Sequence, residues 1–232
     1  MSESRFIKLL SIPKSVYVSG KLCGWRNALK MPVFVRYNCV LNSLKGAVSA
    51  KCGYRSRMLS IGFSCSGIDD KIFSRAVLEI DGCIELSGCV TFCSGCKISV
   101  AKTGVLKLGD GIISNFDTSV ICVNKIEIGA NTAIGWEVMI MDTDWHSVMD
   151  TQTGDIFPAS GAVVVGRNCW LGCRSIVLKN SYLPDGCILA SNSTLTKRFL
   201  MKNTLLAGNP ASEKKHNISK STKGDFQFMD ES

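Results

Sequence analysis

One histidine of this chain stands beside two carboxylates at a spacing suited to acid–base chemistry. The segment MDTDWHS places Asp142, Asp144 and His146 at alternate positions. In an extended chain these three side chains project to the same side. A carboxylate beside an imidazole fixes the tautomer of the ring and raises its basicity, which is the arrangement of a general base. Spacing alone favours a simpler alternative, a loop histidine whose neighbouring carboxylates keep the loop soluble, because charge clusters mark sites only statistically.

Patterns for other common chemistries are weak or absent. Cys93 and Cys96 form a single CxxC pair with Cys89 nearby, whereas a structural zinc site usually needs two such pairs. Cys169 and Cys173 are spaced CxxxC, so we predict no metal site. The chain has two histidines, which excludes a catalytic zinc held by three histidines of one subunit. No P-loop, GxGxxG, kinase or GxSxG pattern occurs in the sequence.

A six-residue repeat marks the elements that must position His146. Residues 165–197 read VGRNCW, LGCRSI, VLKNSY, LPDGCI, LASNST and LTK, and every unit begins with an aliphatic residue. Units of the same length occur upstream, although the phase slips between residues 98 and 128. The leading residues of all these units are Ile80, Leu86, Phe92, Ile98, Ile128, Ile134, Ile140, Val165, Leu171, Val177, Leu183, Leu189 and Leu195.

A period of six indicates a β-solenoid. It fits neither a helix, with apolar residues every three or four positions, nor a two-sided strand, with apolar residues at every second position. It fits short strands joined by turns in which Gly, Asn and Asp take the corners and one apolar residue per strand points inward. Stacked coils of this kind bury a continuous core. The interval between Ile140 and Val165 is not a multiple of six, so we expect a loop inserted after His146.

Length and composition indicate a globular protein. The 232 residues are 46% hydrophobic and 20% charged, which excludes a mainly disordered chain, and no apolar run is long enough for a transmembrane helix. We expect a mixed basic segment over residues 1–75, the solenoid over residues 76–200, and a C-terminal segment with a polar tail over residues 201–232. The tail contains the second histidine, His216. We interpret the twelve cysteines as small buried side chains in a reducing cytoplasm.

Positive charge is concentrated near the N-terminus. Residues 1–75 carry 13 Lys and Arg against 3 Asp and Glu, whereas the rest carries 14 against 16. Such a segment can attract nucleic acid, an anionic membrane surface or an anionic substrate, or it can be a solvated face. It contains no nucleic-acid-binding module and no interleaved aromatics, so we expect no nucleic acid partner. Residues 1–20 make a poor signal peptide. We therefore expect a cytoplasmic protein, with peripheral contact to the inner face of the cytoplasmic membrane as one option.

Four pieces of sequence together carry a family resemblance. They are IEIGANTAIG, the histidine of DTDWHS, VGRNCWLGCRSIVLKN, and the closing LTK…LLAGNPAS. On these pieces, residues 126–212 resemble the hexapeptide-repeat acyltransferases, and more narrowly the sugar and polysaccharide O-acetyltransferases such as galactoside and maltose acetyltransferases. The resemblance covers about 130 of the 232 residues when residues 77–125 are included, and it leaves out residues 1–75.

The resemblance implies a fold, an assembly and a mechanism. The fold is all-β, a left-handed parallel β-helix, and three copies form a homotrimer with an acyl-CoA site between neighbouring subunits. His146 becomes the catalytic base, oriented by Asp144 or Asp142, and deprotonates an acceptor hydroxyl that attacks the thioester directly. A backbone N–H group stabilises the oxyanion, as acyl transfer requires. Trp170, which follows His146 at the spacing typical of the family, walls the acetyl or pantetheine arm, or else packs in the trimer interface.

The resemblance also implies where the two substrates bind. Asn115 and Asp117, in the segment SNFD, correspond to residues that contact the acceptor sugar. Acetyl-CoA is the implied co-substrate, and no metal is implied. The family usually continues Thr-Lys with an acidic residue, Ile and Pro, whereas Arg-Phe-Leu follows here. The residues implied along acetyl-CoA, from the pantetheine arm to the phosphates and the adenine, are Gly172, Cys173, Ser191, Thr196, Lys197, Arg198, Gly208, Asn209 and Pro210.

These observations favour an acetyl-CoA-dependent O-acetyltransferase. Its acceptor is expected to be a sugar hydroxyl of a bacterial surface polysaccharide, such as an O-antigen or capsule, or of its precursor. Two alternatives stay open, because a fold does not fix a function. One is N-acetylation of an amino sugar or of a xenobiotic amine. The other is a β-solenoid binding scaffold whose catalytic site has lapsed.

Overall fold

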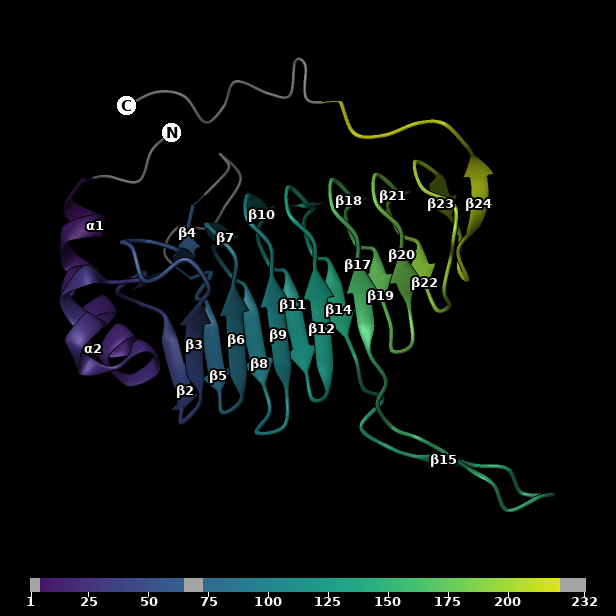
Figure 1. Cartoon of the computed structure of the whole chain (residues 1–232), viewed down its shortest axis with the longest axis horizontal. Coiled ribbons are helices and arrows are strands. Elements are labelled where there is room, and N and C mark those ends of the chain that lie inside the picture. Colours follow the sequence, from purple (N-terminus) through teal and green to yellow (C-terminus); the bar gives the residue numbers. More distant parts are fainter. Residues whose placement is uncertain (1–4, 65–72, 222–232) are drawn as a thin grey trace.

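Three parallel sheets wind around one core in the structure, a computed structural model that describes residues 5–64 and 73–221. Successive strands pass from sheet A to sheet B to sheet C and back to sheet A, so each circuit forms one coil (Figure 1). Strands of neighbouring coils pair in parallel within each sheet, for example β5 with β8 and β6 with β9. The predicted all-β, left-handed parallel β-helix is confirmed.

The strands of each sheet follow one another along the solenoid axis. Sheet A contains, in spatial order, β1 (Val33–Val35), β4 (Leu59–Phe63), β7 (Val90–Cys93), β10 (Ile112–Ser114), β13 (Ala133–Ile134), β18 (Trp170–Leu171), β21 (Ile188–Leu189), β23 (Leu205–Ala207) and the antiparallel β24 (Ser212–Lys215). Sheet B contains β2 (Val40–Leu44), β5 (Val77–Ile80), β8 (Lys97–Val100), β11 (Ser119–Cys122), β14 (Met139–Met141), β19 (Ile176–Val177) and β22 (Thr194–Leu195). Sheet C contains β3 (Ala47–Ala50), β6 (Cys83–Leu86), β9 (Val105–Leu108), β12 (Lys125–Ile128), β17 (Val163–Val165) and β20 (Tyr182–Leu183).

The predicted leading residues form the core. All thirteen are at most 2% exposed. In the C-terminal coils, Leu171 lies beside Leu189 and Val177 lies beside Leu195, so one coil takes three units of six. In the middle of the chain, Ile98 lies beside Val120, and this coil is longer than three units of six. Coils of this length account for the slip in phase.

The solenoid extends beyond the expected range in both directions. Strands β1 to β4 already belong to the three sheets, and β23 continues sheet A after residue 200. Val33 lies beside Leu59, and Leu59 lies beside Val90, so the first two coils are much longer than the C-terminal ones. Turns of this length hide the period of six, and for that reason residues 33–63 do not look like repeats in the sequence.

Two α-helices and a 3₁₀ helix cover the N-terminal end of the solenoid (Figure 1). They are α1 (Arg5–Leu10), α2 (Ile12–Cys23) and η1 (Trp25–Lys30). Strand β1 pairs with β4 on one side only, which would leave its outer backbone groups open to another strand. Helix α2 lies along that side and buries Val18 and Leu22 against the core.

Serine hydroxyls on α2 replace the missing strand. Ser15 and Ser19 are four residues apart and therefore share one helix face. The Ser19 hydroxyl donates to the Val33 carbonyl at 2.9 Å and accepts from the Val33 N–H at 3.1 Å. The Ser15 hydroxyl accepts from the Val35 N–H at 3.0 Å, and its proton is shared between the Ser11 carbonyl at 2.7 Å and the Val35 carbonyl at 3.1 Å. Serine side chains thereby satisfy backbone hydrogen-bonding groups on the open edge of β1, the first strand of sheet A.

The cysteines follow the expected burial only in part, since Cys52 and Cys89 are exposed. Six of the ten free cysteines are buried, and burial raises the pKa of Cys23, Cys122 and Cys169 to about 12. These groups therefore stay neutral thiols and pack as small apolar side chains. Cys93 takes part in a disulfide, so the expectation that all the cysteines are thiols is wrong at this position.

We predict that Ser19→Ala lowers the free energy of unfolding by about 1–3 kcal/mol, because the substitution leaves the buried N–H and C=O of Val33 without their partner. Urea unfolding measures the change. Ser49→Ala is the matched control: Ser49 is exposed on β3, and its substitution is expected to change stability by less than about 0.5 kcal/mol. Equal stabilities of the two variants would contradict the role of the α2 serines in satisfying the open edge of β1.

Candidate active site at the edges of sheet B

The predicted site residues lie in two separate columns of turns. We call the turns between strands of sheets A and B the A–B edge, and name the B–C and C–A edges in the same way. Sheet B lies between the first two edges, and one chain does not bring them together. The A–B edge holds Asn115, Asp117, Gly172, Cys173, Ser191, Gly208, Asn209 and Pro210. The B–C edge holds Asp142, Asp144, His146, Thr196, Lys197 and Arg198.

The expected insertion is a projecting hairpin that leaves the B–C edge after β14. It contains the antiparallel strands β15 (Val148–Met149) and β16 (Ile156–Phe157) (Figure 1). Backbone hydrogen bonds hold its base: the Gly161 N–H donates to the Asp142 carbonyl at 2.9 Å, and the Asp144 N–H donates to the Ala159 carbonyl at 2.8 Å. His146 follows this base and is exposed. The insertion thus presents the imidazole at the outside of the solenoid on a fixed stem.

The three residues of the DTDWH segment do not share one side. Asp142 is fully buried, and its two carboxylate oxygens accept the N–H groups of Val123 and Asn124, each at 2.8 Å. Trp145 has a φ of 62° and breaks the extended alternation on which the prediction depended. The expectation that the three side chains project together is therefore wrong, and Asp142 is bound to the preceding turn of the B–C edge instead of the imidazole.

Asp144 pairs with a lysine that sequence reasoning missed. Its carboxylate lies 2.7 Å from Nζ of Lys179, and the same ammonium donates to the Pro158 carbonyl at 2.6 Å. One lysine from the next coil thus ties together both strands of the stem. Within the described residues, no hydrogen bond or ion pair joins His146 to either carboxylate. The repeat contained a signal for Lys179, because it follows its leading residue Val177 by two positions, as Asp142 follows Ile140.

Cations continue along the B–C edge beyond His146. Lys179 lies in the next coil, and Lys197 and Arg198 lie in the coil after that. Neighbouring coils are about 4.8 Å apart, so these charges extend over about 10 Å from the coil of His146. Lys197 and Arg198 are exposed, and the Arg198 guanidinium lies 5.1 Å from the ring of Tyr182. An exposed column of this kind is suited to phosphate groups.

The A–B edge is built for close stacking of turns. A Cβ atom on Gly172 would lie 2.5 Å from the backbone nitrogen of Ser191 in the next coil, so this glycine has a structural cause independent of any ligand. Cys173 is half-buried and Ser191 is exposed beside it. Trp136 stacks on Phe116 with 5.6 Å between ring centroids, an aromatic pair that sequence reasoning missed.

Trp170 lies apart from both edges. Its side chain is 44% exposed on the outer face of sheet A, beside Ala133 and Ile188. Within one chain it faces away from the B–C edge that carries His146. The Trp170 side chain therefore does not reach His146 within one chain.

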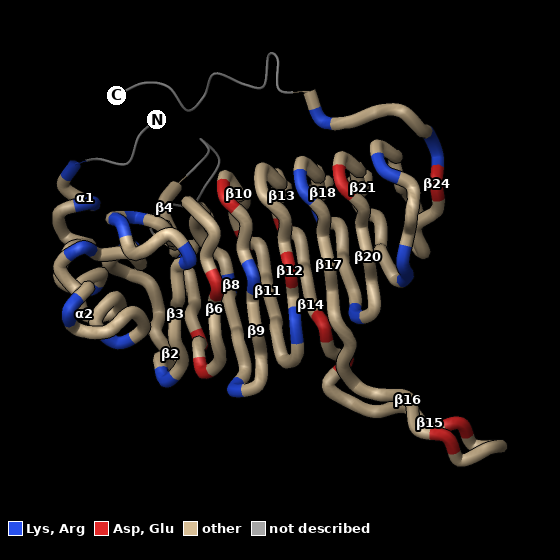
Figure 2. The backbone as a smooth tube through the Cα atoms, viewed as in Figure 1, with Lys and Arg blue, Asp and Glu red and all other residues tan. Residues whose placement is uncertain are grey.

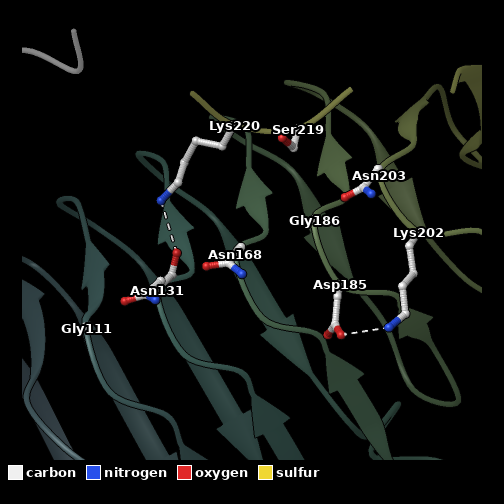
Figure 3. A pocket seen from close by; sticks show the side chains of 9 residues that line it. All are labelled: Gly111, Asn131, Asn168, Asp185, Gly186, Lys202, Asn203, Ser219 and Lys220. Atoms are coloured by element: carbon white, nitrogen blue, oxygen red, sulfur yellow. Dashed lines mark hydrogen bonds and ion pairs between the residues drawn. The ribbon is translucent and has the colours of Figure 1, made fainter. Parts of the chain in front are cut away.

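A separate hollow of about 790 Å³ lies at the C–A edge (Figure 3). Asn131, Asn168 and Asn203 line it from successive turns, and the C-terminal segment crosses it with Lys220, whose Nζ donates to the Asn131 carbonyl at 3.0 Å. Lys202 pairs with Asp185 inside it at 3.1 Å. None of the predicted site residues lines this hollow.

We predict that the two carboxylates differ in their effect on stability. Asp142→Asn is expected to lower the free energy of unfolding by about 1.5–3 kcal/mol, because an amide N–H₂ would replace one of the two accepting oxygens and face the backbone N–H of Val123 or Asn124. Asp144→Asn, the matched control in a partly exposed ion pair, is expected to change it by less than about 1 kcal/mol. Urea unfolding compares them, and an equal change in both would contradict the structural role of Asp142.

Comparison with known proteins gives sequence relatives of partial coverage. No family model matches the chain. An uncharacterized 24.8 kDa protein in the cps region of Klebsiella pneumoniae is 33% identical over 138 residues, which are 60% of this chain and 60% of that protein. A putative lipopolysaccharide biosynthesis O-acetyl transferase, WbbJ, of Escherichia coli strain K12 is 28% identical over 139 residues, which are 56% of this chain and 70% of that protein. The matched region thus spans about three fifths of the first relative.

A solved structure supplies the fold comparison. The crystal structure of the polySia-specific acetyltransferase NeuO aligns with a TM-score of 0.59 over 83% of this chain and 82% of that chain, at 16% identity. At this identity the likeness concerns the fold. By its repeats, its coils and this likeness, the chain has the fold of a left-handed parallel β-helix.

Proposed function

We propose that this protein transfers an acetyl group from acetyl-CoA to a sugar hydroxyl of a bacterial surface polysaccharide or of its precursor. The names of similar proteins support this class of substrate: one is a putative lipopolysaccharide O-acetyl transferase, and one is encoded in a cps region. The structural neighbour NeuO is an acetyltransferase specific for polySia. The proposed activity is thus O-acetylation of a glycan, with a thioester as donor and no metal.

One observation carries the proposal. His146 presents an exposed imidazole on a stem that backbone hydrogen bonds and Lys179 hold in place, and cations follow it along the same edge. A base must reach the proton of a substrate that arrives from outside, so an imidazole open to solvent is suited to this task. Lys197 and Arg198 are the groups suited to the phosphates of acetyl-CoA.

The proposed reaction is a direct transfer. Nε2 or Nδ1 of neutral His146 takes the proton of the acceptor hydroxyl while the hydroxyl oxygen forms a bond to the thioester carbonyl carbon. The resulting tetrahedral oxyanion collapses, the carbon–sulfur bond breaks, and the CoA thiolate takes the proton from the imidazolium. Asp144 acts on the stem through Lys179 and is in this account a positioning residue. Asn115 and Asp117 are proposed to bind the acceptor.

We propose a homotrimer as the active form, because it can join the two edges. In a closed ring of identical subunits, one surface of each copy meets a different surface of the next. Such a ring can bring the B–C edge of one subunit, with His146 and Lys197, to the A–B edge of its neighbour, with Cys173 and Ser191. Within one chain sheet B separates these groups. The same contact offers Trp170 of one subunit to the site of another.

The surface chemistry of the sheets supports an assembly. The outer face of sheet C carries charged pairs, with Glu85 3.1 Å from Lys107 and Lys125 3.5 Å from Glu127. Several apolar residues occupy outer positions of sheets A and B. The hairpin adds four apolar side chains that are more than half exposed in one chain, and an isolated hairpin is marginally stable in water. The apolar residues on these three surfaces are Ile113, Trp170, Ile121, Met139, Met141, Ile176, Val148, Met149, Ile156 and Phe157.

We place the reaction in the cytoplasm, because acetyl-CoA is an intracellular metabolite, and near the inner face of the cytoplasmic membrane. The basic N-terminal segment supports this location. In the part of the chain that the structure describes, no helix is long and apolar enough to cross a membrane. We propose that the contact with the membrane is peripheral, through the basic N-terminal segment.

We predict that His146→Ala lowers kcat by about 10²–10⁴, the range for a positioned general base, and leaves acetyl-CoA binding within about twofold. Release of CoA thiol with a glycan acceptor measures the first, and calorimetric titration measures the second. His216→Ala is the control, since His216 lies near the C-terminal end of the solenoid, where its ring contacts the side chains of Thr204 and Glu213. Near wild-type turnover by His146→Ala would exclude His146 as the general base. Acetyl transfer to amines but not to hydroxyls would show that the acceptor is an amine.

We predict that the pair Ile156→Ser and Phe157→Ser weakens the assembly of three 25.2 kDa chains. Two apolar side chains buried at an interface contribute about 1.5–3 kcal/mol each, so the dissociation constant should rise at least about a hundredfold. Sedimentation over a range of concentrations measures it. Leu200→Ser, another exposed apolar position, is the control, and an unchanged mass in the hairpin variant would contradict the interface.

A further inference from the structure

An exposed apolar surface lies on the helices at the N-terminal end of the solenoid. We call it the N-terminal cap surface. Leu29 is 83% exposed and Phe6 is 65% exposed, although side chains of this kind are usually inside a protein. Soluble monomers rarely expose a group of large apolar side chains without a use for it. The residues of the N-terminal cap surface are Phe6, Leu9, Leu10, Ile12, Tyr17, Trp25 and Leu29.

Helix α1 contributes nothing to the core. None of its residues is buried. Phe6, Leu9 and Leu10 follow one another at the i, i+3 and i+4 positions, so they share one face of the helix. All three are at least 45% exposed. The apolar face of α1 is therefore available for a contact outside this chain.

An aromatic pair joins α2 to η1. The rings of Tyr17 and Trp25 meet edge to face at 6.4 Å between centroids. The Trp25 ring covers Gly20 so closely that a Cβ there would lie 2.4 Å from it. Trp25 is nevertheless 63% exposed, and Nζ of Lys21 lies 6.0 Å from the Tyr17 ring. Tyr and Trp held rigidly beside cations are typical of the boundary between lipid headgroups and acyl chains.

The charge of this region has one sign. Residues 5–68 contain eleven Lys and Arg and no Asp or Glu. Figure 2 shows Lys and Arg on α1, α2 and η1, with no acidic residue among them. Arg5, Lys21, Arg26 and Lys30 are exposed next to the apolar residues. A partner that matches this surface therefore has an anionic outer layer for the cations and an apolar layer beneath it for the exposed apolar side chains.

We infer that the N-terminal cap surface docks on an anionic lipid bilayer. Short helices with aromatic and aliphatic residues on one side and Lys or Arg on the other lie in the interface of such a membrane. The apolar side chains enter the headgroup region, and the cations pair with lipid phosphates. The inference deepens the membrane location given under the proposed function, but its observations are independent of His146. A failure of docking would leave acetyl transfer to be judged by its own assay.

The test uses the full chain with vesicles of phosphatidylglycerol and phosphatidylcholine in equal parts, and with vesicles of phosphatidylcholine alone. Co-sedimentation should show binding to the first and at least about tenfold weaker binding to the second. Raising the salt concentration should weaken the binding. No binding to the anionic vesicles by the folded chain would overturn the inference, as would equal binding to both kinds of vesicle.

Two substitutions at equally exposed positions test where the chain contacts the bilayer. Leu29 and Leu200 are both 83% exposed, so neither substitution by serine removes a core residue. Leu29→Ser should weaken vesicle binding about tenfold, and Leu200→Ser should leave it within about twofold. Arg26→Gln should weaken it about fivefold. Equal losses in the two leucine variants would overturn the inference. So would self-association that Leu29→Ser abolishes without any vesicle binding, because a second copy would then be the occupant.

Discussion

The burial of one aliphatic residue at every sixth position is the constraint on which the rest of this structure depends. Each C-terminal coil takes three units of six and turns three leading side chains inward, such as Leu171, Val177 and Leu183. Strand backbones pair only with the coils above and below. Two consequences follow: side chains for chemistry can stand only at the edges or on the outer faces, and the first coil needs a cover, which the serines of α2 provide.

The period of six explains what could be predicted from the sequence. It identified all thirteen buried leading residues and the insertion after His146, because burial imposes the period directly. It did not identify the first coils, since the long intervals from Val33 to Leu59 and on to Val90 hide it. The direction of His146 could not be predicted either, because the left-handed conformation of Trp145 interrupts the extended alternation just before it. The two bridging serines of α2 look like ordinary polar residues until strand β1 is placed beside them.

The candidate site follows from the same geometry. A triangular solenoid keeps its edges apart, so the base and cations of the B–C edge cannot meet the A–B edge of the same chain. The resemblance assigned both groups to one reaction, and the structure places them on opposite sides of sheet B. The proposed contact between subunits would reconcile the two, and the exposed apolar hairpin beside His146 is a suitable element for it. In this account Lys179 is a positioning residue, since it holds together the two strands of the stem that carries His146.

Complementation between two inactive chains tests this shared site most directly. His146→Ala removes the base from the B–C edge, and Ser191→Trp blocks the A–B edge at an exposed turn. Each variant alone should be inactive. In trimers assembled at random from equal amounts of both, about a quarter of the sites pair an intact B–C edge with an intact A–B edge. The account predicts about a quarter of the wild-type transfer activity from co-expressed chains. Activity no greater than that of the separate variants would contradict it, because the site would then lie within one chain.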